Sequence, residues 1–273
     1  MKVFLRKTSA LVFGRQNAPG SGNAATVVWC NSPPSNELLA EIARREGTPI
    51  TAFLIQGTST QVRFFTPYRE LPFCGHGALA AGAAEALRQG CSRISLMADS
   101  RNFTVNIASS GLATLILPGP GSDRVENDQG LLLDALKIET DALADYPAVH
   151  VASVGSPKWL VEMRNIDILR SLQPDMSALV KISHKAEING VYAFTRRDIP
   201  SDIDALARGF NPLGGIGEDA ATGIAVAAIA WLWRTTTAGR WIVVDQGIGV
   251  SNLNRLLARV EGNEIHVGGN VVF

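Results

Sequence analysis

One histidine in this sequence is placed where an imidazole could transfer protons. His76 lies between Gly75 and Gly77, and an apolar, alanine-rich stretch follows it. Glycines on both sides let the backbone approach a ligand closely, and imidazole gains and loses protons near neutral pH. His76 is therefore a candidate general acid or base. The remaining histidines lack such a setting and are interpreted as packing or surface residues: His150, His184 and His266.

A cysteine lies close to this histidine. Cys74 is two residues before His76, near the predicted start of the same helix, where a thiol can become reactive. Its alternative interpretation is a small buried apolar residue. Cys30, in a predicted strand, and Cys91, after a helix, are expected to be inert. Three cysteines without a Cys-x-x-Cys pair or a zinc-type histidine spacing argue against a disulfide framework and against a metal site.

Two adjacent acids, Glu218 and Asp219, precede a second apolar helix predicted over about 223–234. They lie in a glycine-bearing loop, 214–223, in which Thr222 is expected to cap the helix. A carboxylate at a helix start can be a simple dipole partner. Because the helix looks buried, at least one of the two is expected to point toward a ligand.

The same loop permits a competing interpretation. The pattern Gly215-x-Gly217-x-x-Ala220 matches a loose dinucleotide fingerprint, and 241–245 resembles a strand that ends in a ribose-binding acid. Two arguments oppose it. Residues 209–213 do not look like a buried parallel strand, and the two acids would repel a pyrophosphate. A Rossmann-type oxidoreductase is therefore disfavoured.

The elements that must position these residues alternate between strands and helices. A strand is predicted over 23–30, and the next helix has Ser35 as its N-cap and Gly47 as its left-handed stop. Further predicted elements are the hairpin 50–56 with 61–66, the helix 76–88, the strands 112–117, 150–154, 159–163, 190–195 and 240–245, short helices near 131–136 and after Asp175, and the hairpin 257–260 with 264–267.

An internal repeat is the most informative feature of the chain. Residues 63–67 and 208–212 share the pattern Arg-x-Phe-x-Pro, 145 positions apart, and each copy precedes an acid-bearing loop and an alanine-rich helix. This order indicates a duplication. Two related lobes could direct two helix N-termini, with their free N–H groups and positive dipole ends, into one cleft. Such a cleft would bind a carboxylate.

Composition points to a small-molecule partner. The chain has 273 residues, 46% of them hydrophobic, and 25 basic residues balance 25 acidic ones. Neither a nucleic-acid footprint nor a membrane-binding patch is visible. The charged start and the lack of an apolar run of about 18 residues predict a cytoplasmic protein. We expect an N-terminal lobe, 1–119, and a C-terminal lobe, 120–262, with 263–273 free to return to the first.

Three motifs resemble those of the PhzF-like family, named for an isomerase of phenazine biosynthesis. They are the segments 22–28, 65–76 and 218–225, in the family's order, and Val267-Gly268-Gly269 also fits. The resemblance implies an α+β, diaminopimelate-epimerase-like fold of two pseudo-symmetric lobes, each a curved mixed sheet around a central helix, often in a homodimer. It places His76 and Asp219 at catalytic or substrate-binding positions. The implied substrate-holding backbone is that of Gly75, His76, Gly77, Thr222 and Gly223.

Two positions depart from the family pattern. Ile50 stands where the family has its acid/base glutamate, and Ile224 replaces a serine, so the family's usual proton transfer cannot operate here. In the related diaminopimelate epimerases, Cys74 would match the first catalytic thiol, but Thr222 stands in place of the second. A symmetric two-thiol racemase is therefore disfavoured.

The sequence thus predicts a cofactor-independent isomerase of secondary metabolism. It would move a proton within a small, cyclic or unsaturated, carboxylate-bearing substrate, with His76, Asp219 and Cys74 as proton-handling groups and Ile50 and Ile224 lining the site. A non-catalytic small-molecule binder and an amino-acid racemase or epimerase remain as alternatives.

Overall fold

The computed structural model describes residues 5–14, 21–57, 60–99, 101–119, 123–249 and 253–273. The chain divides into two compact units, residues 1–117 with 266–273 and residues 118–265. Residues 1–4 of the charged start and 120–122 of the expected boundary cluster lie outside the described part.

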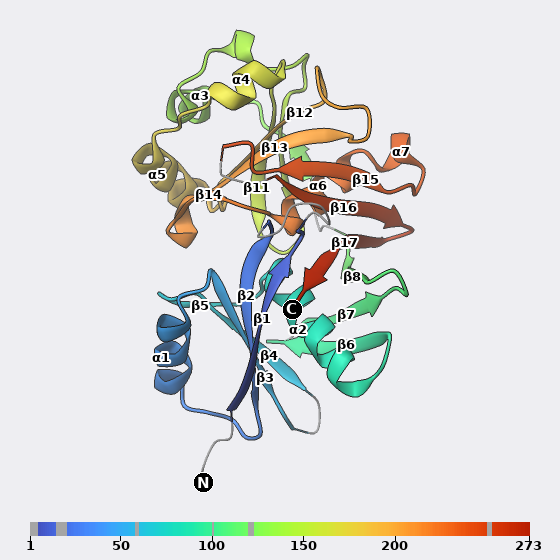
Figure 1. The fold of residues 1–273 in the computed structure, drawn as a ribbon. Coiled ribbons are helices and arrows are strands. Elements are labelled where there is room, and N and C mark those ends of the chain that lie inside the picture. The colour runs from blue at the N-terminus through green and yellow to red at the C-terminus, as the bar shows by residue number, and fades with distance from the viewer. Residues whose placement is uncertain (1–4, 15–20, 58–59, 100, 120–122, 250–252) are drawn as a thin grey trace. The chain divides into compact units, whose positions relative to one another are not determined.

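The first unit is a mixed sheet that surrounds helix α2, Gly75–Gln89 (Figure 1). Its strands are β1 Leu5–Val12, β2 Asn23–Cys30, β3 Ile50–Ile55, β4 Gln61–Phe65, β5 Glu70–Leu71, β6 Arg93–Ala98, β7 Arg101–Ile107, β8 Leu112–Pro118 and β17 Glu264–Val272. Pairs β1–β2, β3–β4, β6–β7 and β7–β8 are antiparallel, whereas β2–β3 and β4–β6 are parallel. Because β17 pairs with both β1 and β8, the strands close around the helix.

Small residues let the strands approach α2 closely. The alanines of its first three turns are buried, and a Cβ on Gly82 would come within 2.5 Å of Val105. Helix α1, Asn36–Glu46, covers the outside of this sheet, packed on β3 and β4. As predicted, Ser35 accepts from the N–H of Leu38, and Gly47 ends the helix with a φ of 65°.

The second unit repeats this plan around helix α6, Gly223–Leu232, which packs on β11 and β16. Its strands are β9 Asp123–Val125, β10 Val149–Ser153, β11 Pro157–Glu162, β12 Val191–Thr195, β13 Ala205–Asn211, β14 Ile216–Asp219, β15 Ile242–Gln246 and β16 Asn254–Glu261. Pairs β10–β11, β12–β13 and β15–β16 are antiparallel, and β11–β12 and β13–β15 are parallel.

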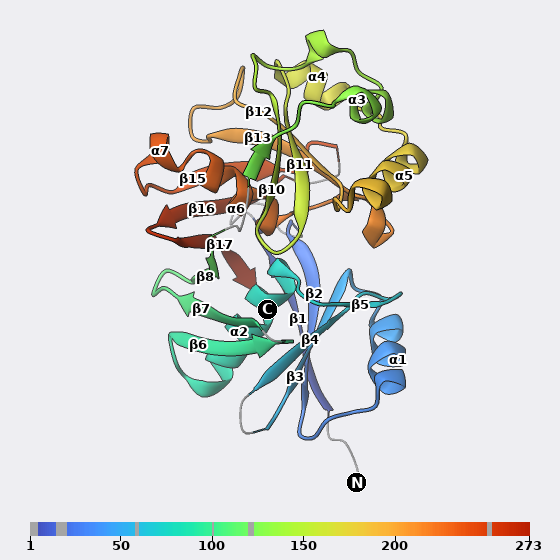
Figure 2. The same ribbon diagram turned by 180° about the vertical axis from the view of Figure 1, so that it is seen from behind.

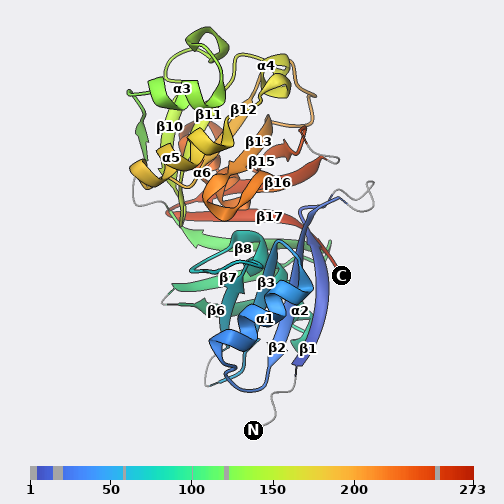
Figure 3. The same ribbon diagram turned by 90° about the vertical axis from the view of Figure 1, so that its left-hand side faces the viewer.

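An outer apolar cluster covers the other face of the second sheet. Trp159, Val161 and Val191 pack there against three helices. The helices are α3 Gly130–Leu136, α4 Ile166–Ser171 and α5 Met176–Ala186, which Figures 2 and 3 show on this side of the second unit. The remaining helical segments of the unit are α7 Arg234–Thr237 and the 3-10 turns η1 Thr140–Ala142 and η2 Pro212–Gly214.

The expected helices and strands are present, and several more were not expected. The second long helix is shorter than predicted, because it ends at Leu232 and α7 begins two residues later. Sequence patterns also missed β1, β5, β6, β7, β9, β13, β14 and α4. Strand β14 lies within the segment 214–223 that was predicted as a loop, so that part of the prediction is wrong. In β7, Phe103 and Val105 are buried and alternate with Thr104 and Asn106, and in β6 Leu96 and Ala98 are the buried positions, so apolar alternation was present in both strands and was overlooked.

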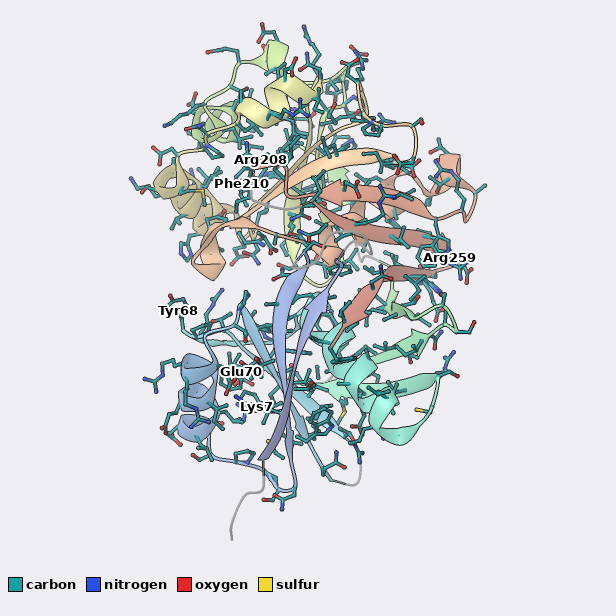
Figure 4. All side chains as sticks on the ribbon, viewed as in Figure 1. Lys7, Tyr68, Glu70, Arg208, Phe210 and Arg259 are labelled. Atoms are coloured by element: carbon teal, nitrogen blue, oxygen red, sulfur yellow. The ribbon has the colours of Figure 1, made fainter. Side chains whose placement is uncertain are left out.

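The repeat seen in the sequence extends to side-chain contacts. Arg63 on β4 binds Glu70 on β5 through two hydrogen bonds, of 2.6 and 2.7 Å, and stacks on Phe65 at 5.2 Å. Arg208 on β13 binds Glu218 on β14 in the same way and stacks on Phe210 at 5.1 Å (Figure 4). The two units therefore share strand order, strand direction and this ion pair, which confirms the pseudo-symmetric α+β fold.

Candidate active site

The start of α2 brings together Cys74 and His76. Cys74 is the N-cap residue, with an extended backbone, and its side chain caps no helix N–H. Its sulfur instead lies 3.4 Å from Nδ1 of His76. Both side chains are half-buried, and Gly75 and Gly77 are buried beside them. The thiol and the imidazole predicted as proton-handling groups thus form a hydrogen-bonded pair.

Ile50 lies at this same helix start. It is the first residue of β3 and is 1% exposed. A Cβ on Gly77 would be 3.3 Å from Cγ1 of Ile50 and 3.0 Å from the ring of Phe64. Only glycine lets the helix sit this close. The ring of Phe64 continues through Phe73 to Phe103 in edge-to-face contacts, so the surroundings of the pair are apolar.

The start of α6 has a polar side-chain network in place of the aromatic rings. Thr222 is its N-cap residue, but the prediction that its hydroxyl caps the helix is wrong. That hydroxyl donates to Oδ2 of Asp219 at 2.8 Å, and its oxygen accepts from Nε2 of Gln246 at 3.1 Å. With these partners the hydroxyl is turned away from the helix N–H groups. Gly223 is buried and Ile224 half-buried at the same place.

Asp219 is held by several elements of the second unit. Its Oδ2 also accepts from Nδ2 of Asn211 at 2.8 Å, and Oδ1 lies 3.4 Å from the N–H of Ala221. Gln246 ties down the backbone, because its Nε2 donates to the carbonyl of Asp219 at 2.7 Å and its Oε1 accepts from the N–H of Thr222 at 2.9 Å. Asp219 is therefore a carboxylate of defined orientation.

The neighbouring Glu218 has a different role. It binds Arg208, whose remaining amine donates to carbonyls of the α4 segment: Leu169, Arg170 and Leu172. Both side chains of this pair are largely buried, with exposed fractions of 9% and 12%. Glu218 thus joins β13, β14 and α4, and Asp219 is left as the acid at the helix start.

Four members of this network were not predicted from the sequence as site residues: Lys158, Tyr192, Asn211 and Gln246. Burial and the nearby charge of Asp219 raise the pKa of Tyr192 well above its ordinary value, and its hydroxyl donates to Oε1 of Gln246 at 2.9 Å. Gly209 makes room for the group, since a Cβ there would lie 2.8 Å from Oγ1 of Thr222. One signal was available: Lys158 interrupts the otherwise apolar start of a strand.

Residues 209–211 belong to a buried strand, β13, but they pair antiparallel with β12 and β14, and residues 212–214 form η2. The parallel pairing of β13 with β15 is confined to residues 205–207. The dinucleotide fingerprint also fails for a second reason. Gly217 lies in strand β14, antiparallel to β13, and not at a helix start where a pyrophosphate could bind N–H groups. Asp245, the expected ribose ligand, binds Arg255 through two hydrogen bonds.

The remaining candidates lie elsewhere in their units. Burial raises the pKa of Cys30 to about 11, which fits the expected inert thiol. His150 contacts the carbonyl of Pro147, His184 is exposed on α5, and His266 is buried on β17. Within the described residues, no three His, Cys, Asp or Glu side chains gather as metal ligands. No helix in the described part of the chain is long and apolar enough to cross a membrane.

Comparisons with known proteins agree on one family. The family model of phenazine biosynthesis-like proteins, PhzC-PhzF, matches residues 12–272. An uncharacterized isomerase of Clostridium acetobutylicum is 30% identical over 74% of this chain and 71% of its own. The trans-2,3-dihydro-3-hydroxyanthranilate isomerase of Pseudomonas chlororaphis is 28% identical over 94% of this chain and 93% of its own.

Solved structures agree on the fold. The phenazine biosynthesis protein of Bacillus anthracis, of the PhzF family, superposes with a TM-score of 0.84 at 18% identity, over 100% of this chain and 97% of that one. From the matched motifs, the duplicated sheets and these relatives, we conclude that the chain belongs to the PhzC-PhzF family and is an isomerase with the diaminopimelate-epimerase-like fold.

Proposed function

We propose that this isomerase moves a proton, without a cofactor, between two carbons of a small, cyclic or unsaturated metabolite that carries a carboxylate. The observation that supports it most is the pair of helix starts. At one lie His76 and Cys74, and at the other lies the oriented carboxylate of Asp219.

Anion binding follows from the uncapped helices. Neither Cys74 nor Thr222 places its side chain on the N–H groups of its helix. These groups point outward from the helix end and carry a partial positive charge. We propose that the substrate carboxylate binds there, at the N–H groups of residues 75–77 or of residues 223 and 224, because the N–H of Thr222 already donates to Gln246. We further propose that the side chains of Ile50 and Ile224 contact the apolar face of the substrate.

The proton transfer needs one acceptor and one donor. Asp219 would take a proton from a carbon next to the unsaturation, and the bonding electron pair would delocalise into the substrate. The imidazolium of His76 would then deliver a proton to a second carbon, which gives the isomer. Asp219 would release its proton to solvent water and His76 would take one up, so both groups return to their starting states. Cys74 would assist through its contact with the imidazole. Because Ile50 offers no titratable atom, the glutamate-based family route is not available.

The test is exchange from deuterated water. Purified protein, dialysed against EDTA, is incubated with candidate cyclic and unsaturated carboxylates and followed by NMR. The first candidate is trans-2,3-dihydro-3-hydroxyanthranilate, the compound named for the Pseudomonas chlororaphis relative. We expect deuterium at one specific carbon of the product. Thermal stabilisation by ligands with no exchange would support the non-catalytic binder, and exchange at a stereocentre with loss of optical purity would support a racemase.

A further inference from the structure

Lys158 is a buried lysine that the proposed proton transfer does not use. It lies on β11 with 2% of its surface exposed. Neighbouring Trp159 and Val161 point into the outer apolar cluster, so the alternating pattern of a strand directs Lys158 and Leu160 to the opposite face. Helix α6 packs against this strand. Lysines are rarely this buried unless partners hold the ammonium group.

Its partners connect it to Asp219. Nζ donates to the carbonyl of Asn189 at 2.7 Å and to Oδ1 of Asn211. An amide oxygen that accepts from lysine must turn its NH2 group the other way, and in Asn211 this group donates to Oδ2 of Asp219. The amide of Asn211 is thus a relay whose orientation depends on Lys158.

We propose that Lys158 is a positioning residue that orients the Asp219 carboxylate through the side-chain amide of Asn211. The proposal deepens the proposed function, because it explains how one of the two proton-handling groups is held. A neutral amine donates a weaker hydrogen bond than an ammonium group. The hold on Asn211 therefore weakens when Lys158 loses its proton.

The charge of Lys158 changes in an accessible pH range. Burial lowers its pKa to about 8, and the negative charge of Asp219 opposes this shift. Other titratable groups on the packed elements are Tyr192 on β12, whose pKa is raised, His150 on β10, which contacts Pro147, and Glu162, farther along β11, which binds Arg196. Among these groups, Asp219 is therefore the charged group that acts on the pKa of Lys158.

The pH dependence of folding stability tests the proposal without a substrate, because the pKa of Lys158 differs between the folded and unfolded chain. The pKa of Lys158 is lower in the folded chain than in the unfolded one, so between pH 8 and 10.5 only the unfolded state keeps the proton. Stability from this group therefore rises with pH across that window and is flat below it. We expect the melting temperature of the wild type minus that of Lys158→Met to increase by about 3 °C per pH unit from pH 8 to 10. Lys185→Met, an exposed lysine on α5, is the matched control and should show no such trend.

Asp219→Asn tests the electrostatic coupling between Lys158 and Asp219. Without the negative charge of Asp219, Lys158 should lose its proton at a lower pH. The pH range over which stability rises should therefore begin below pH 8. This measurement compares the variant with the wild type alone, and it remains decisive if Lys158→Met does not fold. An unchanged window in Asp219→Asn, or a wild type whose stability does not rise relative to Lys158→Met, would overturn the proposal.

Deuterium exchange adds the functional test. Once a substrate is identified, the rate of deuterium exchange by the wild type should fall above pH 8. Lys158→Met should exchange more slowly by about tenfold or more, and its rate should not show this fall at alkaline pH. Absence of exchange in the wild type would contradict the proposed function, and the linkage result would still decide the role of Lys158. If the exchange rate of Lys158→Met fell above pH 8 as that of the wild type does, the result would contradict positioning of Asp219 by the ammonium group.

Discussion

The starts of α2 and α6 are the same backbone element with different side chains. Residues 70–76 and 218–224 align without a gap, 148 positions apart. The ion-paired acid, the N-cap residue and the first helical glycine correspond: Glu70 with Glu218, Cys74 with Thr222, and Gly75 with Gly223. The differences are in the groups that could transfer protons. His76 corresponds to Ile224, and Asp219 corresponds to Leu71.

The surroundings differ in the same way. Phe64 packs under α2, and its counterpart under α6 is Gly209, which leaves room for Thr222 and Gln246. Matching the strand registers, Lys158 corresponds to the buried alanine Ala25. One copy has thus kept an apolar setting with an imidazole and a thiol, and the other has a polar network around one carboxylate. The duplicated frame positions both, and each copy supplies a group that the other lacks.

The largest expected effect concerns His76 and Asp219, the proton-handling groups at the two helix starts. Asp219→Asn and His76→Ala should each slow deuterium exchange by roughly a hundredfold or more, because each removes a proton-handling group. Leu71→Asn changes the position that corresponds to Asp219 and should slow exchange less than threefold. Circular dichroism checks that the folds are intact. Near-full activity in both Asp219→Asn and His76→Ala would contradict the assignment of Asp219 and His76 as the proton-handling groups.

The two ion pairs give the next effect. Glu218→Gln leaves Arg208 largely buried without its carboxylate and should cost about 2 to 3 kcal/mol of unfolding free energy. Glu70→Gln breaks the corresponding pair, which is more exposed at 26% and 42%, and should cost less than about 1 kcal/mol. Urea denaturation measures both. Equal losses would mean that burial does not distinguish the two copies.

A smaller effect concerns the thiols. Cys74 is half-buried beside His76, whereas Cys30 is buried and burial raises its pKa to about 11. Iodoacetamide should therefore alkylate Cys74 at least about tenfold faster than Cys30 at pH 8, as followed by mass spectrometry. Cys74→Ser should lower turnover more than stability. Equal, slow labelling would assign Cys74 to packing.

The smallest effect is at Ile50. Ile50→Val removes one buried methylene beside Gly77 and should cost about 1 kcal/mol of stability. If Ile50 contacts the substrate, the variant should change relative rates among substrates of different size more than the rate on the best one. Val191→Ala, at a buried position in the outer cluster of the second unit, should lower stability and leave that preference unchanged. An unaltered substrate preference in Ile50→Val would contradict a contact between Ile50 and the substrate.

Local signals were enough for much of the fold. The Ser35 cap, the Gly47 stop and the alanine-rich helix 76–88 depend on contacts within a few residues, and all three predictions are confirmed. The repeat of Arg63 and Arg208 predicted two related halves before any contact was known. Strand β13 was missed because its residues 205–210 are all buried, so it has no apolar alternation and its strand partners define it.

The sequence by itself determined the family, the duplicated helix starts and the chemistry available at each, since these depend on residue types at fixed spacing. Tertiary structure alone decided which side chains meet around Asp219. Lys158, Asn211, Thr222 and Gln246 come from four separate segments, and Thr222 was expected to cap its own helix. A hydrogen-bond partner 53 residues away, as Asn211 is from Lys158, leaves no periodicity in the chain. Strand pairing and helix packing, and not sequence spacing, set the distance between such groups.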